Sequence, residues 1–315
     1  MSSELAHTAA RDVAGRYGAI STIDRFPMGL CHYVFDVTLA NAERLVIRVA
    51  DPGNRHLLAG AMAWSALLRP LGVPLPMIIS SDLDAPLPYL VLERIPGRDL
   101  GDAYASLTEA QRMALAQAVS EIQLLVRRLG PASGYGYSYD PTANPPERSW
   151  SKVVHNNLRR SGARLGSAPA RLRTLHAHVK RLVDSRSAYF AQVRPLAFLD
   201  DLTTKNVLVQ GGRLTGIVDV DLVCFGDPLY TPALTKVALV ASGAQTDYVA
   251  EWLRQEQPDA AALDAFNVYC AVFCMDLLSE SGVTFNRDEP EELEQARMGR
   301  LVRFADEILA QAGSV

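Results

Sequence analysis

Apolar and polar positions indicate strands over most of the first ninety residues. Four short runs are rich in β-branched and aromatic side chains or are bounded by turn residues, as strands are. A polar turn around Asn41 joins two of them, as in a β-hairpin, and residues 54–68 follow a helical pattern. The predicted strand runs are residues 33–39, 43–49, 75–80 and 88–94. We therefore expect a small antiparallel sheet with one helix packed on it.

The pattern changes after Pro96-Gly97, a dipeptide typical of a chain break between elements. A long amphipathic helix is predicted at 107–129, and helices return from residue 228 to the end. Between them we expect a loop at 131–149, basic helices at 150–193 and short β runs at 196–222. The fold class is therefore α+β. Its parts are a β-rich N-terminal lobe (1–95) and a helical C-terminal lobe (96–315), which contains a hairpin segment (197–222) and an insert (130–195).

Composition excludes several classes of protein. The 315 residues carry 31 Lys and Arg against 35 Asp and Glu, a net charge of −4, which excludes a general nucleic-acid-binding protein. Four cysteines are too few for a disulfide scaffold. The longest apolar stretch, 268–278, is interrupted by Asp276 and is shorter than the ~18 residues of a membrane span. With no apolar export segment at its start, the chain is expected to be cytoplasmic.

Candidate chemistry is concentrated between residues 198 and 230. Two apolar runs flank Gly211 and Gly212, which predicts a β-hairpin with a glycine turn. Asp201 precedes the hairpin, Asn206 begins its first strand and Asp219 follows its second. Because the entrance and exit of a hairpin lie side by side, these three side chains should converge at its open end, with Asp221 close by.

Such a cluster suits phosphoryl transfer. Carboxylate and amide oxygens are ligands that Mg²⁺ prefers, and a carboxylate outside the metal shell can accept the proton of a hydroxyl. Phosphoryl transfer needs both, since its barrier falls mainly through positioning and charge neutralisation. A single aspartate at a strand end is usually a turn or cap residue, but several polar residues in this register predict a site.

The same segment resembles the catalytic core of the aminoglycoside phosphotransferase and choline kinase group. The matching residues are 199–208 (LDDLTTKNVL), 216–220 (GIVDV) and 226–231 (GDPLYT). The resemblance implies a bilobal protein-kinase-like fold that binds ATP and Mg²⁺ between its lobes and phosphorylates a hydroxyl of a small molecule.

Carried over by position, the resemblance assigns roles to individual residues. Asp201 is the catalytic base, while Asn206 and Asp219 are Mg²⁺ ligands. Asp221 is an additional ligand or an acceptor behind the ligands, and Asp227 is a structural aspartate that ties down the catalytic loop. Lys205 either approaches the transferred phosphoryl group or is a solvated loop residue.

The resemblance also implies features of the N-terminal lobe. Gly29, in the turn of residues 26–32, would cover the phosphates, and Arg48 would pair with the α- and β-phosphates. The Glu93 carbonyl and the Ile95 amide would face the adenine. A carboxylate on the following helix should hold the strand cation, but none occurs at 52–69, where the expected place falls near Gly60.

Two further departures and the charge of the insert leave open questions. Leu199 replaces a family histidine, and Thr231 an aspartate. Because of Leu199 and the missing helix carboxylate, a weak or inactive nucleotide-binding regulator is the alternative to an active kinase. Residues 130–195 carry eleven Lys and Arg and three acids, a net charge of +8. This disfavours a polycationic aminoglycoside and favours an anionic or neutral acceptor. The basic residues could instead form a solvated helix face, and the acidic run 288–294 could attract a cation.

Overall fold

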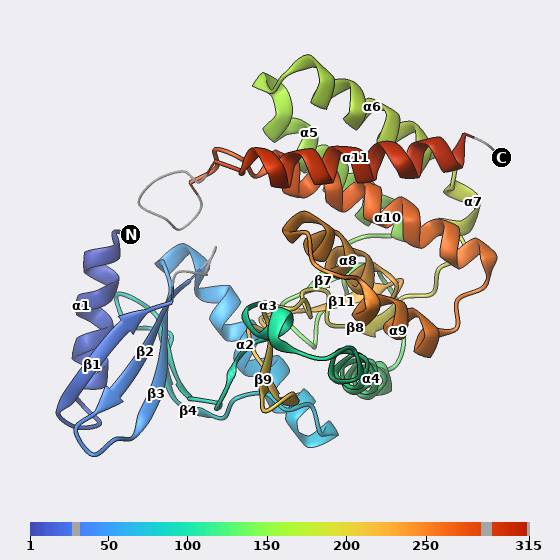
Figure 1. The fold of residues 1–315 in the computed structure, drawn as a ribbon. Coiled ribbons are helices and arrows are strands. Elements are labelled where there is room, and N and C mark those ends of the chain that lie inside the picture. The colour runs from blue at the N-terminus through green and yellow to red at the C-terminus, as the bar shows by residue number, and fades with distance from the viewer. Residues whose placement is uncertain (27–31, 285–291, 314–315) are drawn as a thin grey trace.

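The N-terminal lobe is built on a five-stranded antiparallel sheet with strand order β1-β2-β3-β5-β4 (Figure 1). In this computed structural model, residues 1–26, 32–284 and 292–313 are described. The strands are β1 (Ile20–Arg25), β2 (Tyr33–Leu39), β3 (Arg44–Val49), β4 (Ile78–Asp82) and β5 (Tyr89–Glu93). The hairpin predicted around Asn41 is confirmed, with Tyr33 opposite Val49. β4 begins three residues later than expected because Pro74 and Pro76 have no N–H to donate to a ladder.

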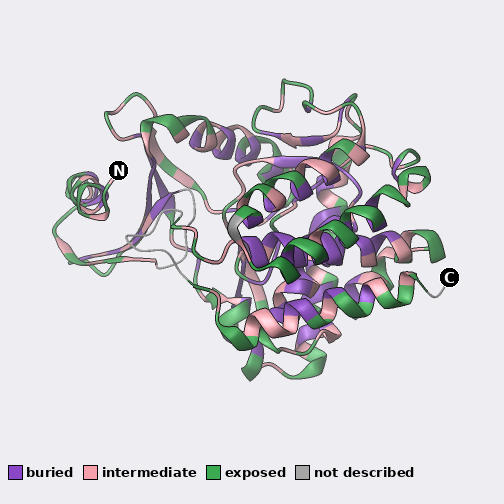
Figure 2. Ribbon diagram, turned by 90° about the horizontal axis from the view of Figure 1, so that it is seen from above, coloured by how far each residue is buried: buried purple, intermediate pink, exposed green. Residues whose placement is uncertain are grey.

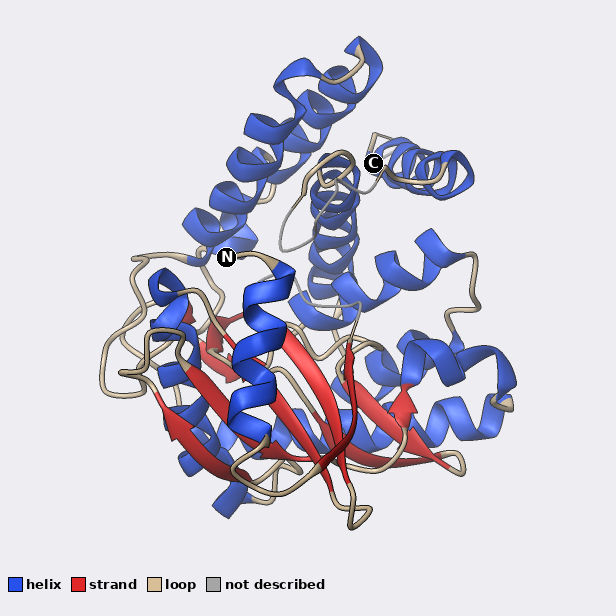
Figure 3. Ribbon diagram, turned by 90° about the vertical axis from the view of Figure 1, so that its left-hand side faces the viewer, coloured by secondary structure: helices blue, strands red, loops and turns tan. Residues whose placement is uncertain are grey.

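Helices cover both faces of this sheet. α1 (Ser3–Ala14), capped by the Ser2 hydroxyl, packs its alanine-rich side on one face (Figure 3). α1 was not predicted, because small alanines mark its apolar face only weakly. Alternate residues of β3, such as Ile47, are buried on that face. α2 (Arg55–Leu68), the predicted helix, packs on the opposite face against Val46 and neighbours. Since side chains alternate along a strand, Arg48 lies on the α2 face.

The C-terminal lobe is mainly helical. α10 is its central helix and packs against α5, α8 and α11. α10 is long and apolar enough to cross a membrane, but 67% of its most apolar window is buried inside the protein, as in the core helix of a folded domain. Figure 2 shows the buried residues on the inner sides of these helices. The helices are α3 (Leu100–Ala103), α4 (Glu109–Val126), α5 (Trp150–Arg164), α6 (Ala170–Asp184), α7 (Ser187–Phe190), α8 (Tyr230–Ser242), α9 (Asp247–Glu256), α10 (Ala260–Ser279) and α11 (Gln295–Ala312).

Two small sheets lie between the sheet of the N-terminal lobe and these helices. One has the order β10-β9-β6 and the other β7-β11-β8. β7 (Gly136–Ser138) lies within the segment expected to be a loop; it forms because it pairs with the distant β11 (Val223–Gly226). The remaining strands are β6 (Arg98–Asp99), β8 (Leu196–Phe198), β9 (Val207–Gln210) and β10 (Arg213–Ile217). The lobe boundary at residues 95 and 96 stays a prediction.

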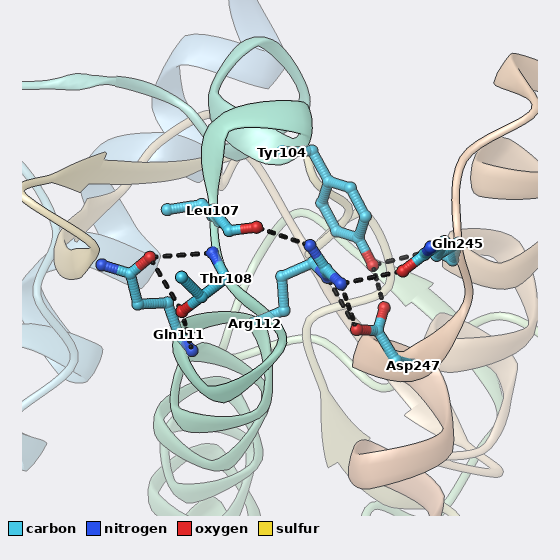
Figure 4. Close-up of polar contacts among 7 residues, drawn as sticks. All are labelled: Tyr104, Leu107, Thr108, Gln111, Arg112, Gln245 and Asp247. Atoms are coloured by element: carbon cyan, nitrogen blue, oxygen red, sulfur yellow. Dashed lines mark hydrogen bonds and ion pairs between the residues drawn. The ribbon is translucent and has the colours of Figure 1, made fainter.

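A partly buried polar cluster joins α4 to α9 (Figure 4). Arg112, on α4, is 9% exposed and donates to Asp247 at 2.7 Å and to the Leu107 carbonyl at 2.6 Å. The Tyr104 hydroxyl donates to the Asp247 carboxylate at 3.0 Å and to the Gln245 carbonyl at 2.9 Å. Because every partner is engaged, the cluster fixes the position of α9 beside α4.

Candidate active site

The predicted catalytic hairpin is formed by β9 and β10, with Val207 opposite Ile217. Gly211 and Gly212 make its turn with φ of 58° and 75°, the left-handed conformation that a two-residue hairpin turn requires. At the open end, the Val218 amide donates to the Asn206 carbonyl at 3.0 Å. The loop that enters the hairpin and the segment that leaves it therefore lie side by side.

Asp201 lies in the loop before this hairpin, and solvent reaches its side chain. The Asn206 side chain donates to the Asp201 carbonyl at 2.8 Å, which holds the loop closed. Desolvation by the surrounding protein, with the negative charges of Asp200 and Asp219, raises the pKa of Asp201 to about 8. Lys205 and Asn206 oppose this rise. The charge of Asp219 acts on Asp201 because the hairpin brings their two segments side by side, and a raised pKa suits a group that accepts a proton.

Asp219 directly follows the hairpin, in a strained left-handed conformation with φ of 63°. Half of its side chain is exposed, and its Oδ1 lies 2.9 Å from Arg48 Nη2. Desolvation raises its pKa, against the effect of Arg48.

The donor set at this point fits Mg²⁺. Asn206 uses its amide nitrogen within the loop, which leaves the amide oxygen as its ligand atom, and Asp219 supplies a carboxylate. The repulsion between neighbouring carboxylates is a further reason to expect a cation here. Among the residues described, no three His, Cys, Asp or Glu side chains form a metal cluster. Two protein ligands are nevertheless typical of Mg²⁺, which keeps waters and binds phosphate oxygens.

Asp221 makes different contacts from Asp219. Its Oδ2 accepts from Arg48 Nη2 and from His32 Nε2, both at 2.8 Å. Burial opposes ionisation, but Arg48 and His32 outweigh it and lower the pKa of Asp221 to about 2. Its Oδ1 is buried and has no hydrogen-bond partner among the described residues. The structure thus places Asp221 against the N-terminal lobe.

The other predicted residues are placed with varying detail. Gly29 lies outside the described residues. Glu93 ends β5, where its carboxylate accepts from the Met77 amide at 3.1 Å. Ile95 is buried, and its side chain occupies the space beside Gly216, where a Cβ would lie 2.5 Å from it. The segment after β5 therefore packs on the catalytic hairpin, and the adenine-facing roles of Glu93 and Ile95 stay predictions.

Three residues that sequence reasoning did not select support this site. Besides His32, they are Gln123 on α4 and Thr231 on α8. Gln123 donates to the Leu199 carbonyl at 2.8 Å and accepts from the Leu199 amide at 2.9 Å. The Thr231 hydroxyl donates to the same carbonyl at 2.8 Å. Both motif departures, Leu199 and Thr231, therefore meet in one hydrogen-bond network that holds the catalytic loop.

A sequence signal for Gln123 existed. It is a polar residue in the apolar stripe of α4, beside Ile122 and Val126, and is 1% exposed. A buried polar side chain must find a partner, so its position indicated a tertiary contact. Asp227 accepts from Tyr189 of α7 at 2.9 Å and from Tyr269 of α10 at 2.8 Å. Its role in tying down the catalytic loop stays a prediction.

Comparison with known proteins gives matches over nearly the whole chain. A thermostable mutant of aminoglycoside phosphotransferase APH(4)-Ia, in ternary complex with AMP-PNP and hygromycin B, superposes with a TM-score of 0.71 at 18% identity, covering 98% of this chain and 99% of that one. A putative fructosamine-3-kinase from Haemophilus somnus superposes with a TM-score of 0.63 at 12% identity, covering 96% of each chain. At these identities the likeness shows the fold, a kinase-like one. No curated protein matches in sequence.

The family itself is shown by sequence. The profile of the phosphotransferase enzyme family matches residues 22–266, which include the sheet, the catalytic hairpin and most of the C-terminal helices. Arg48, Asp201, Asn206, Asp219 and Asp221 all lie within that match. This chain therefore belongs to the phosphotransferase enzyme family.

Proposed function

We propose that this phosphotransferase moves the γ-phosphoryl group of ATP, with Mg²⁺, to a hydroxyl of a small molecule. One observation carries the proposal: bonds from the Val218 amide to Asn206 and from Asn206 to the Asp201 carbonyl bring the loop of Asp201 beside the segment of Asp219, which contacts Arg48 from the sheet. A base, a metal ligand and a phosphate-binding cation are the parts that phosphoryl transfer requires.

Each residue has a distinct role in this mechanism. Asp201 orients the acceptor hydroxyl and accepts its proton, and Asn206 and Asp219 would hold Mg²⁺. When bound, Mg²⁺ would offset the negative charge of the phosphates. Arg48 pairs with phosphate oxygens, for which the guanidinium fork is suited.

The acceptor is proposed from the charges beside Asp201. Asp200 and Lys205 act on Asp201, and Arg160 acts on Asp200. Lys205 also acts on Glu280, which is influenced by the ion-paired group of Arg160, Arg164 and Asp276. Arg160 pairs with Asp276 at 2.8 Å, so cations of the basic insert are balanced by acids from α10. The net charge of +8, counted for the insert alone, therefore overstates the positive charge near this site. We propose an acceptor that is neutral or carries both signs of charge, rather than a polycation or a polyanion.

The inactive regulator is the less favoured alternative. Its sequence support was Leu199 in place of the family histidine and the missing helix carboxylate. The bonds of Gln123 and Thr231 to Leu199 supply loop support by another route. A cytoplasmic location stays a prediction.

The test is ADP formation over a panel of neutral sugars, amino alcohols and aminoglycosides. Wild type should turn over at least one neutral or mixed-charge acceptor. Asp201→Asn should lose turnover by at least about 100-fold, as expected for a catalytic base, and should still bind AMP-PNP in calorimetry. Asp24→Asn, an exposed change on β1, is the matched control. Unchanged turnover in Asp201→Asn contradicts the mechanism, and nucleotide binding without phosphorylation of any acceptor supports the regulator.

A further inference from the structure

The α2 helix has no room for the carboxylate that would hold Arg48. Between Arg55 and Leu68 it contains no Asp or Glu. At Gly60, an added Cβ would lie 2.3 Å from the Asp221 carbonyl oxygen and 3.0 Å from that of Tyr139. Any side chain there would collide with main-chain atoms of the C-terminal lobe. The close packing of α2 on these atoms therefore excludes a helix carboxylate at this place.

Arg48 is held from the other lobe instead. Arg48 is 5% and His32 4% exposed, and both donate to the same Asp221 oxygen at 2.8 Å. Arg48 Nη2 also contacts Asp219 at 2.9 Å, but Asp219 is half exposed, whereas the Asp221 side chain is 13% exposed. Charge-assisted hydrogen bonds between buried groups are the stronger kind. Asp221 is therefore the partner that Arg48 keeps. Asp219 is the partner that can leave Arg48 to bind another group.

We propose that Asp221 is a positioning residue that holds Arg48 for the nucleotide phosphates in place of a helix carboxylate, with His32 fixing Asp221. This rests on the proposed nucleotide-binding function. Asp221 follows the catalytic hairpin, so one contact both aligns Arg48 and joins the two lobes. Asp219 can then bind the metal while Arg48 keeps its buried partner.

Double-mutant binding separates this role from direct metal ligation. AMP-PNP affinity is measured for wild type, Asp221→Asn, Arg48→Met and the double variant, with and without Mg²⁺. We expect Asp221→Asn to weaken binding about tenfold, the size of one charge-assisted bond, equally with and without Mg²⁺. In the Arg48→Met background the same change should have little further effect. A loss that occurs only with Mg²⁺ and persists without Arg48 would overturn the proposal and make Asp221 a metal ligand.

Melting of the apoprotein tests the same contact without nucleotide. The losses in Tm from Asp221→Asn and Arg48→Met should be non-additive, because both remove one interaction. Arg44→Gln, at the start of the strand that carries Arg48, removes a separate ion pair with Asp36 of β2 and should add to Asp221→Asn. Additive losses for Arg48 and Asp221 overturn the proposal. If wild type binds no nucleotide, the proposed function fails, while this melting experiment still decides whether Asp221 holds Arg48.

His32→Leu, which has no side-chain donor, provides a milder variant if Asp221→Asn does not fold. It removes one of the two donors to Asp221 and leaves Arg48 in place. We expect a smaller loss of AMP-PNP affinity, again independent of Mg²⁺ and again absent in the Arg48→Met background. A full-sized loss in that background contradicts the role of His32.

Discussion

Replacing Gln123 by methionine should destabilise the catalytic loop. The two side chains have similar volume, so little cavity or overpacking energy is expected. The change removes the bonds to the amide and the carbonyl of Leu199. The carbonyl keeps its bond from Thr231 at 2.8 Å, but the buried amide loses its partner. An unsatisfied buried donor costs about 1–3 kcal/mol and the second bond about 1 kcal/mol, so the loss should be about 2–4 kcal/mol.

Chemical denaturation followed by circular dichroism measures this loss. Thr231→Val is the matched control: it removes one bond to the same carbonyl, which Gln123 continues to satisfy, and should cost only about 1 kcal/mol. Because Asp201 lies two residues after Leu199, Gln123→Met should also lower kcat more than it raises the KM for ATP. A Gln123→Met variant within about 0.5 kcal/mol of wild type, the range of ordinary surface changes, would refute the reasoning.

Three other changes have defined outcomes. Arg112→Met leaves the Asp247 carboxylate without its cation, with the Tyr104 hydroxyl still donating to it, and should cost about 3 kcal/mol in denaturation, the low end for a buried pair because the Asp247 side chain is 20% exposed. Hydrogen bonding to Arg254 lowers the pKa of Glu251 from 4.5 to about 2, so its stabilisation is complete above pH 4.5 and is lost as the pH falls towards 2. The stability difference between wild type and Glu251→Gln should shrink over that range in melts; a constant difference contradicts the shift. Gly60→Ala should cost about 1–3 kcal/mol through overpacking against a carbonyl oxygen 2.3 Å away, and an unchanged melting temperature excludes that close contact.

Local patterns predicted much of the fold because they depend on neighbouring residues. Alternation along β2 and β3 gave both strands and their hairpin, and Gly211-Gly212 marked the catalytic turn. That turn alone also predicts that the loop of Asp201 lies beside the segment of Asp219, since a hairpin brings its two ends together. The net charge of the insert predicted the charge around the site less well. The sequence gives the basic insert a net charge, but not the acidic partner, Asp276, that α10 provides to Arg160.

Other features depend on contacts between distant parts of the chain. β7 becomes a strand only because β11 pairs with it, and α1 is stabilised by its burial on the sheet rather than by a strong apolar pattern. Sequence could show that α2 lacks a carboxylate, but only packing shows why, since Gly60 touches the Asp221 main chain.

The sequence by itself determined the phosphotransferase motif, the catalytic hairpin and the strand that carries Arg48, because each is encoded within a few tens of residues. Tertiary structure decided what holds these parts. Asp221 reaches Arg48 across 173 positions and Gln123 reaches Leu199 across 76. Such contacts leave no periodic trace in the sequence, because they form only when the packing of whole helices and sheets brings the two segments within hydrogen-bond distance.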